Sequence, residues 1–131
     1  MKHFKLTFIL LFTLLLLTTP VHAADFEATV TRVIDGDTFK FKTYLLDVTI
    51  SGACRMKNYN APETHGAEKP QGLKAKQYLI DLIGDKPVKI SASRKDKYGR
   101  WLCEAPEIDK EMIEYLKDYP GRDKYIVRKA P

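Results

Sequence analysis

The sequence lacks a hydrophobic run long enough to cross a membrane. Its longest apolar stretch, residues 6–17, is shorter than the roughly 20 residues that a bilayer core requires. Lys2 and Lys5 precede this stretch, Pro20 ends it, and the small residues of Val21-His22-Ala23 follow. This pattern is typical of a secretory signal peptide over residues 1–23 and disfavours the alternative, a transmembrane anchor.

The sequence also lacks a cysteine directly after the apolar run, which argues against a lipid anchor, and it has no internal repeats or low-complexity segments. Residues 24–131 are therefore expected to form one small domain with a single core. Without Lys2 and Lys5 the net charge falls from +5 to +3, which permits an anionic partner without requiring one. We expect an exported protein, periplasmic or extracellular, that is monomeric and makes no membrane contact after signal removal.

Alternating apolar residues predict short strands, and apolar residues at helical spacing predict two helices. Asp35-Gly36-Asp37 and Ser51-Gly52 are expected to be turns, and Gly84 a helix C-cap. Asp109 is expected to cap the second helix. The strands are expected over 26–34, from 38 onwards with an end between 42 and 50, and over 53–57, 88–92 and 101–104, and the helices over 73–83 and 110–119.

This order, β-β-β-α-β-β-α, suits an α+β fold built on a five-stranded barrel of the OB type. The helix between the third and fourth strands is a further feature of that fold. A small open sheet with helices is the alternative.

Cleavage of a phosphodiester bond requires residue types that this sequence holds at strand ends and in loops. A hard cation needs oxygen ligands, an attacking water needs a carboxylate, and the charged phosphate of the transition state needs guanidinium donors. Candidates for these roles fall in three segments, which are IDGDT with Asp35 and Asp37, RMKNYNAPE with Arg55, Asn60, Ala61 and Glu63, and DKYGR with Lys97, Tyr98 and Arg100.

Each candidate also has an ordinary structural explanation. Asp37 could bond its own backbone in a turn, and Arg55 could lie on the exposed side of a strand. Glu63 could be an exposed loop acid, and the basic loop could be a solvated surface. His65, the one histidine after residue 23, is expected to have no role. No single motif decides between these readings.

The order and spacing of the three segments together resemble the staphylococcal nuclease (thermonuclease) family over residues 28–116. The family fold is an OB barrel with helices, in agreement with the order of elements above. The resemblance implies an enzyme that uses calcium to hydrolyse DNA or RNA at the bond to the 5′-oxygen.

The resemblance also implies a role for each matching residue. Glu63 matches the general base, or at least the residue that orients the attacking water, and Arg55 and Arg100 match the two arginines that hold the scissile phosphate. The other matches are the calcium ligands Asp37, Asn60 and the Ala61 carbonyl, the acidic neighbour Asp35, and the contacts Lys97 and Tyr98 to a terminal phosphate.

The chain departs from the family pattern at three places. Asn60 stands where the thermonuclease has an aspartate, and the lost charge is expected to weaken calcium binding or to allow another divalent metal. The segment between Asp37 and Arg55 is longer, and the C-terminal end is shorter and lacks the family's last long helix.

Cys54 and Cys103 are the two cysteines, and two states are open for them. Export to an oxidising compartment favours a disulfide, whereas two buried free thiols are the alternative. If Arg55 and Arg100 converge as the resemblance implies, the adjacent cysteines are neighbours, and a bridge would join the strands that carry both arginines.

Three functions compete on the sequence. The first is an exported calcium-dependent nuclease acting on DNA or RNA, with single strands favoured because OB-type grooves with few aromatic platforms usually bind single strands without strong sequence preference. The second is a non-catalytic OB-fold module that binds nucleic acid or another partner, which the Asn60 departure favours. The third is a small structural domain, which has no reason to combine Glu63 with two arginines.

Overall fold

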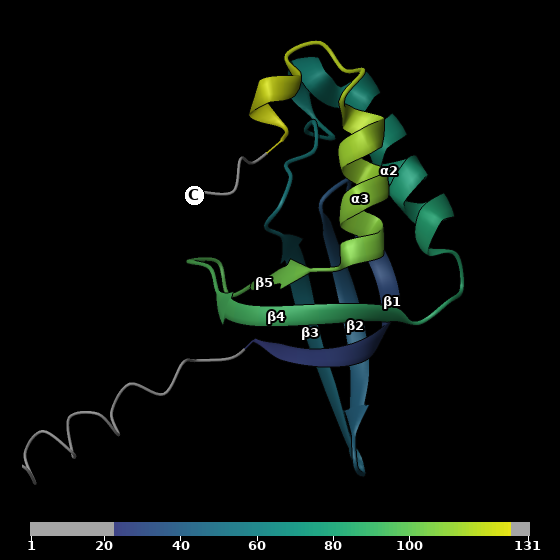
Figure 1. Cartoon of the computed structure of the whole chain (residues 1–131), viewed down its shortest axis with the longest axis vertical. Helices are drawn as coiled ribbons and strands as arrows, with labels where there is room; N and C mark the ends of the chain where they lie inside the picture. Colours follow the sequence, from purple (N-terminus) through teal and green to yellow (C-terminus); the bar gives the residue numbers. More distant parts are fainter. Residues whose placement is uncertain (1–22, 127–131) are drawn as a thin grey trace, which may run out of the picture.

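The strands of the chain close into a five-stranded barrel (Figure 1). The computed structural model describes residues 23–126, so the expected signal peptide lies outside the described residues. Neighbouring strands follow the order β1-β2-β3-β5-β4, with β3 and β5 parallel and the other pairs antiparallel. The predicted α+β barrel of the OB type is confirmed, and the open-sheet alternative is wrong. The strands are β1 (Ala24–Asp35), β2 (Thr38–Leu45), β3 (Val48–Met56), β4 (Val88–Lys95) and β5 (Trp101–Glu104).

Two helices lie side by side and cover one end of the barrel (Figure 1). The turn η1 (Gly66–Glu68) leads into α2 (Lys69–Ile83) between β3 and β4, and α3 (Pro106–Leu116) follows β5 before the short turn η2 (Arg122–Lys124). Within the described residues, none of the helices has the length and apolar character needed to span a bilayer.

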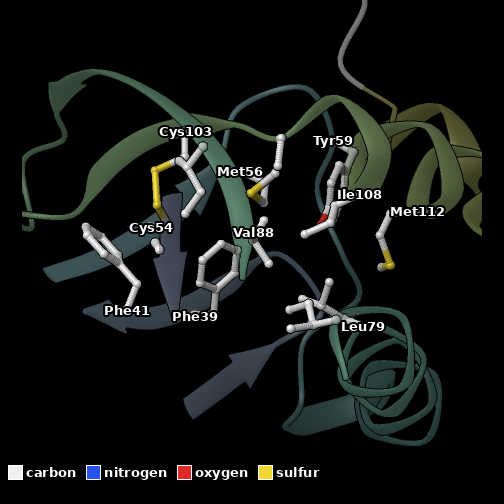
Figure 2. Packing of buried hydrophobic residues seen from close by; sticks show 14 of the residues in the cluster. Phe39, Phe41, Cys54, Met56, Tyr59, Leu79, Val88, Cys103, Ile108 and Met112 are labelled. Atoms are coloured by element: carbon white, nitrogen blue, oxygen red, sulfur yellow. A yellow bond between two sulfur atoms is a disulfide. The ribbon is translucent and has the colours of Figure 1, made fainter. Parts of the chain in front are cut away.

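The core fills the barrel and continues under the helices (Figure 2). Phe39 and Phe41 alternate with exposed residues along β2, as expected for a strand with one face inside a barrel. Leu79 from α2 and Met112 from α3 are fully buried and close the end of the barrel. Tyr78 and Tyr115 stack between the helices with their ring centroids 4.0 Å apart.

The second turn does not lie at Ser51-Gly52, as the sequence suggested. Those residues are inside β3, and the hairpin turns at Leu46, whose φ is +53°. Gly52 pairs with Phe41 and serves packing instead of chain reversal. A Cβ at Gly52 would lie 3.0 Å from the Phe41 ring and 3.2 Å from Trp101, so glycine makes room for two aromatic side chains.

Both helices begin earlier than periodicity predicts. α2 starts at Lys69 instead of residue 73, because Pro70 is compatible with the first helical turn. α3 starts at Pro106 and ends at Leu116, so Asp109 lies inside the helix and is not the residue before it. The Asp109 carboxylate nevertheless accepts hydrogen bonds from the Ala105 N–H at 3.3 Å and from Asn58 Nδ2 at 2.7 Å. Gly84 does follow α2 with a positive φ.

Cys54 and Cys103 form a disulfide between β3 and β5, so of the two states open to the cysteines the structure has the bridge. Their Cα atoms are 5.7 Å apart, and both residues are completely buried. The bridge joins the only parallel pair among the described strands. Arg55 directly follows one bridged cysteine, and Arg100 directly precedes the short strand that holds the other.

Candidate active site

The turn Asp35-Gly36-Asp37 joins β1 to β2 and holds a buried carboxylate. Asp37 is only 5% exposed. Its Oδ1 accepts a hydrogen bond from the Thr38 hydroxyl at 2.9 Å, and its own N–H donates to Asp35 Oδ1 at 3.1 Å. A Cβ at Gly36 would lie 2.6 Å from the Ala61 Cβ, so only glycine allows the turn and the following loop to approach this closely.

Arg55 connects this turn to the loop after β3. Its Nη1 lies 2.5 Å from Asp37 Oδ2, and its Nη2 donates to Asn60 Oδ1 at 2.6 Å. The Ala61 N–H donates to the same Asp37 Oδ2 at 2.6 Å. Direct contacts therefore link four residues expected at the site, although two separate segments of the sequence supply them: Asp37, Arg55, Asn60 and Ala61.

The environment of Asp37 makes its charge costly. Burial raises the pKa of Asp37 to about 7, the Arg55 guanidinium lowers it, and the neighbouring Asp35 carboxylate raises it. The Arg55 guanidinium and the Asp35 carboxylate thus act on the pKa of Asp37 in opposite directions. A further cation at this position would favour the ionised form of Asp37, which is the electrostatic condition for binding a metal ion.

The oxygen donors of this cluster fit a hard divalent cation. Asp35 and Asp37 supply carboxylates and Asn60 an amide oxygen, the ligand types that Ca²⁺ prefers. Among residues 23–126, no three His, Cys, Asp or Glu side chains gather as a ready metal site, because Asn60 takes the place of a third acid. Arg55 spans Asp37 and Asn60, so its guanidinium occupies the donor oxygens that a cation would use.

Glu63 lies beside the cluster in sequence but extends into solvent. Its side chain is 63% exposed, and its one ionic neighbour in the described part of the chain is His65 Nδ1, 3.7 Å away. Its backbone is fixed, because a Cβ at Gly72 would overlap the Glu63 carbonyl oxygen, so the loop rests directly on α2. The backbone of Glu63 is thus held against α2, but its carboxylate extends into solvent without contacting Asp37.

Arg100 is held by Asp96, a residue that the sequence analysis did not single out. Asp96 Oδ2 accepts from Arg100 Nε and lies 2.8 Å from Nη2, while Oδ1 accepts from the Tyr98 and Arg100 backbone N–H groups. Lys97 and Arg100 both lie near the exposed Tyr98 ring, at 4.9 Å and 5.3 Å from its centroid. An aspartate that starts a turn of the form D-x-x-G was the available signal.

The C-terminal segment contacts the site loop, which no local pattern indicated. The Asn60 N–H donates to the Tyr125 carbonyl at 2.5 Å, and Asn60 Nδ2 donates to the Lys124 carbonyl at 3.1 Å. Tyr59 forms a backbone bridge with Ile126, and its hydroxyl donates to the Gly36 carbonyl at 3.1 Å. Residues 124–126 thus orient the amide of Asn60.

Glu68 fastens this segment to the loop that carries Glu63. Its carboxylate accepts from the Glu63 N–H and the Tyr125 hydroxyl, both at 3.1 Å, and pairs with Lys124. The hydrogen bond from Lys124 is the main reason that the pKa of Glu68 is lowered to about 2, with the Glu63 N–H contributing next. The Glu68 side chain therefore links the loop that carries Glu63 to the C-terminal residues Lys124 and Tyr125.

We expect stability to depend on the ionisation of Glu68 at acidic pH. A depressed carboxyl pKa contributes stability that is fully present above the unfolded value near 4.5 and is lost as the pH falls towards about 2. As the pH is lowered from 4.5 towards 2, the unfolding temperature of Glu68→Gln should therefore fall less steeply than that of the original chain. Glu114→Gln, which removes an exposed pair with Lys117, is the control. Parallel pH profiles for Glu68→Gln and the original chain would contradict this role.

Comparison with curated proteins finds nucleases. No protein-family model matches the chain. It is 34% identical over 113 residues to an "Uncharacterized endonuclease" of Haemophilus influenzae, covering 81% of this chain and 60% of the relative. It is 33% identical over 79 residues to "Micrococcal nuclease" of Shigella flexneri, covering 60% of this chain and 41% of the relative. These similarities support a staphylococcal nuclease-like family for the chain.

A third similarity covers only a small part of the relative. "Endonuclease YhcR" of Bacillus subtilis is 37% identical over 94 residues, which is 63% of this chain but 8% of the relative. The chain spans no more than 60% of the length of any of these three relatives. The family resemblance expected from IDGDT, R-x-x-x-x-N-A-P-E and DKYGR is confirmed.

Proposed function

We propose that the chain is an exported, calcium-dependent nuclease that hydrolyses phosphodiester bonds of DNA or RNA, with single strands favoured. It acts as a monomer in the periplasm or outside the cell. The observation that carries the proposal is the direct contact of Arg55 with both Asp37 and Asn60, because it unites a phosphate-binding group with hard oxygen donors. The names of the three relatives support the reaction class.

Arg55 and Arg100 bind the scissile phosphate. Asp37 and Asn60 now accept the two ends of the Arg55 fork, and a phosphodiester would take over that fork as charge builds on its oxygens. Asp96 engages Nε and Nη2 of Arg100 and so holds the guanidinium in a defined orientation, while the donors of Nη1 serve the phosphate. Lys97 and Tyr98, beside Arg100, contact a terminal phosphate.

Glu63 activates the attacking water. Its carboxylate is exposed, so it can bind the attacking water without first losing a protein partner other than His65. The loop that carries it is anchored by the Glu68 bond to its N–H and by the contact with Gly72. Glu63 orients the water for in-line attack and takes its proton.

Calcium, when bound, supplies Lewis-acid stabilisation of the attacked phosphate. Asp37, Asn60 and the Ala61 carbonyl would hold it, with Asp35 beside them. Because Asn60 contributes no charge, another divalent metal can replace calcium at this site. With these oxygens given to a cation, the Arg55 guanidinium would be available to a substrate phosphate.

The test is cleavage of labelled single-stranded DNA by the purified chain over residues 24–131, with calcium and then with excess chelator. We expect cleavage that requires calcium and that falls about 10²–10³-fold in Glu63→Gln, as for the loss of a positioned catalytic group. Glu107→Gln, an exposed acid of α3, is the matched control. If no divalent metal gives cleavage above the Glu63→Gln level while nucleic acid still binds, the chain is a binding module and the nuclease proposal fails.

A further inference from the structure

The hairpin of β2 and β3 has an outer face of which the proposed site uses only Arg55. The two strands pair in unbroken register from Thr38 opposite Arg55 to Leu45 opposite Val48. Because side chains alternate along a strand, the face opposite the buried Phe39 and Phe41 carries the residues between them. That face holds Thr38, Lys40, Lys42 and Tyr44 on β2, and Thr49, Ser51, Ala53 and Arg55 on β3.

This outer face is basic and carries no acid. Lys40 and Lys42 are exposed, and their partners across the hairpin are Ala53 and Ser51. On the other side of β2, Arg32 of β1 lies opposite Lys40. Like charges opposite each other destabilise a sheet. Within residues 23–126 none of these three cations forms an ion pair, so the sheet bears this repulsion with no compensating carboxylate.

The hairpin continues beyond the barrel (Figure 1). The pairing of β1 with β2 reaches Lys42, and the pairing of β5 with β3 begins at Cys54, so the hairpin beyond these points is a free two-stranded ribbon. Tyr44 stands on the outer face of this ribbon and is 71% exposed. A row of two lysines and a tyrosine thus leads from Arg55 towards the tip.

We propose that Lys40, Lys42 and Tyr44, joined by Arg32, form a binding track for the backbone of single-stranded nucleic acid that leaves the Arg55 site along the hairpin. Residues two apart on a strand are separated by about 6.7 Å, which is comparable to the distance between successive phosphates of an extended single strand. Each lysine can therefore meet one phosphate. The exposed Tyr44 ring offers a stacking surface for the next base.

The track rests on the proposed function for its substrate, but it is tested by binding alone. Affinity for a fluorescent 12-nucleotide single-stranded DNA, and for the RNA of the same sequence, is measured by anisotropy in the Glu63→Gln background with calcium. The variants are Lys40→Gln/Lys42→Gln and Tyr44→Ala, and the control is Lys74→Gln/Lys110→Gln, which removes the same charge from α2 and α3. Thermal unfolding verifies that each variant is folded.

We expect the Lys40→Gln/Lys42→Gln pair to weaken binding of the 12-mer about 10-fold or more. The slope of the logarithm of the binding constant against the logarithm of the salt concentration should decrease in magnitude by about 1.4, the value for two phosphates of a single strand. Tyr44→Ala should weaken binding about 5-fold or more without changing that slope. The control should leave the slope unchanged. Equal slopes for the track and control pairs overturn the track, even where calcium-dependent cleavage is present. Track-dependent binding keeps the track even if the chain with Glu63 intact shows no metal-dependent cleavage, which would overturn the nuclease alone. The DNA and RNA arms identify the preferred backbone.

Discussion

Replacing Arg55 by alanine is expected to lower the rate of DNA cleavage about 10²–10³-fold, the usual cost of removing one donor that stabilises transition-state charge. Arg55→Lys should not restore the rate, because an ammonium group cannot bridge two oxygens as the guanidinium does at Asp37 and Asn60. Initial rates on single-stranded DNA at saturating calcium measure both effects. Arg94→Ala, an exposed arginine of β4, is the control.

A second variant tests what Arg55 contributes to folding. Arg55→Ala leaves the buried Asp37 carboxylate without its ion pair, so we expect it to lower the free energy of unfolding by about 1–3 kcal/mol. Adding Asp37→Asn removes the costly charge and should recover much of that stability, as measured by urea unfolding. Cleavage stays low in the double variant, because it also lacks a proposed metal ligand. A double variant no more stable than Arg55→Ala would contradict the ion pair as the source of the loss.

Loss of the disulfide is expected to have a comparably large effect on stability. The bridge closes a loop between residues 49 positions apart, and the chain-entropy model assigns such a loop about 4 kcal/mol at 25 °C. Because both cysteines are fully buried, Cys54→Ala/Cys103→Ala is the appropriate double variant, since alanine adds no buried hydroxyl. Urea unfolding of this variant, and of the original chain with and without reductant, measures the loss.

The disulfide variant also tests the geometry of the site. The bridge joins the strands next to Arg55 and Arg100, so cleavage well below the unfolding temperature should fall as well. A loss of unfolding free energy below about 1 kcal/mol would mean that the unbridged chain is already constrained in its denatured state.

Local patterns in the sequence were sufficient for the barrel and for part of the site. Alternation identified β4 and β5, and helical spacing identified the buried face of α2 around Ala75 and Leu79. The resemblance implied a site shared by Asp37, Arg55 and Ala61, and the structure brings them into contact because the antiparallel pairing of β2 with β3 places the end of β3 beside the turn that precedes β2. Glu63 and Lys97 keep roles that the resemblance implies and that only experiment can test.

Other features depend on contacts that carry no periodic signal. The hydrogen bonds from Asn60 end on the backbone carbonyls of residues 124 and 125, more than 60 positions away, and any side chain at positions 124 and 125 would permit them. Ser51-Gly52 was predicted to be a turn because glycine is common in turns. Glycine occurs here for another reason, since β3 must leave room for the Phe41 ring. The start of α3 was missed because Pro106 stops a helix in its interior but begins one at its N-terminus.

The closure of the barrel bears on the order of folding. The first strand pairs with the fourth, Ala24 with Ala92 and Ala28 with Val88, so the last seam joins residues 60 or more positions apart. Non-local pairing of this kind is slow, because the entropy of closing a long loop is lost before the contacts form. The closing strand also begins directly after the proposed signal peptide. The barrel of a newly made chain therefore stays open until β4 is available, and such a delay would suit the export that we propose.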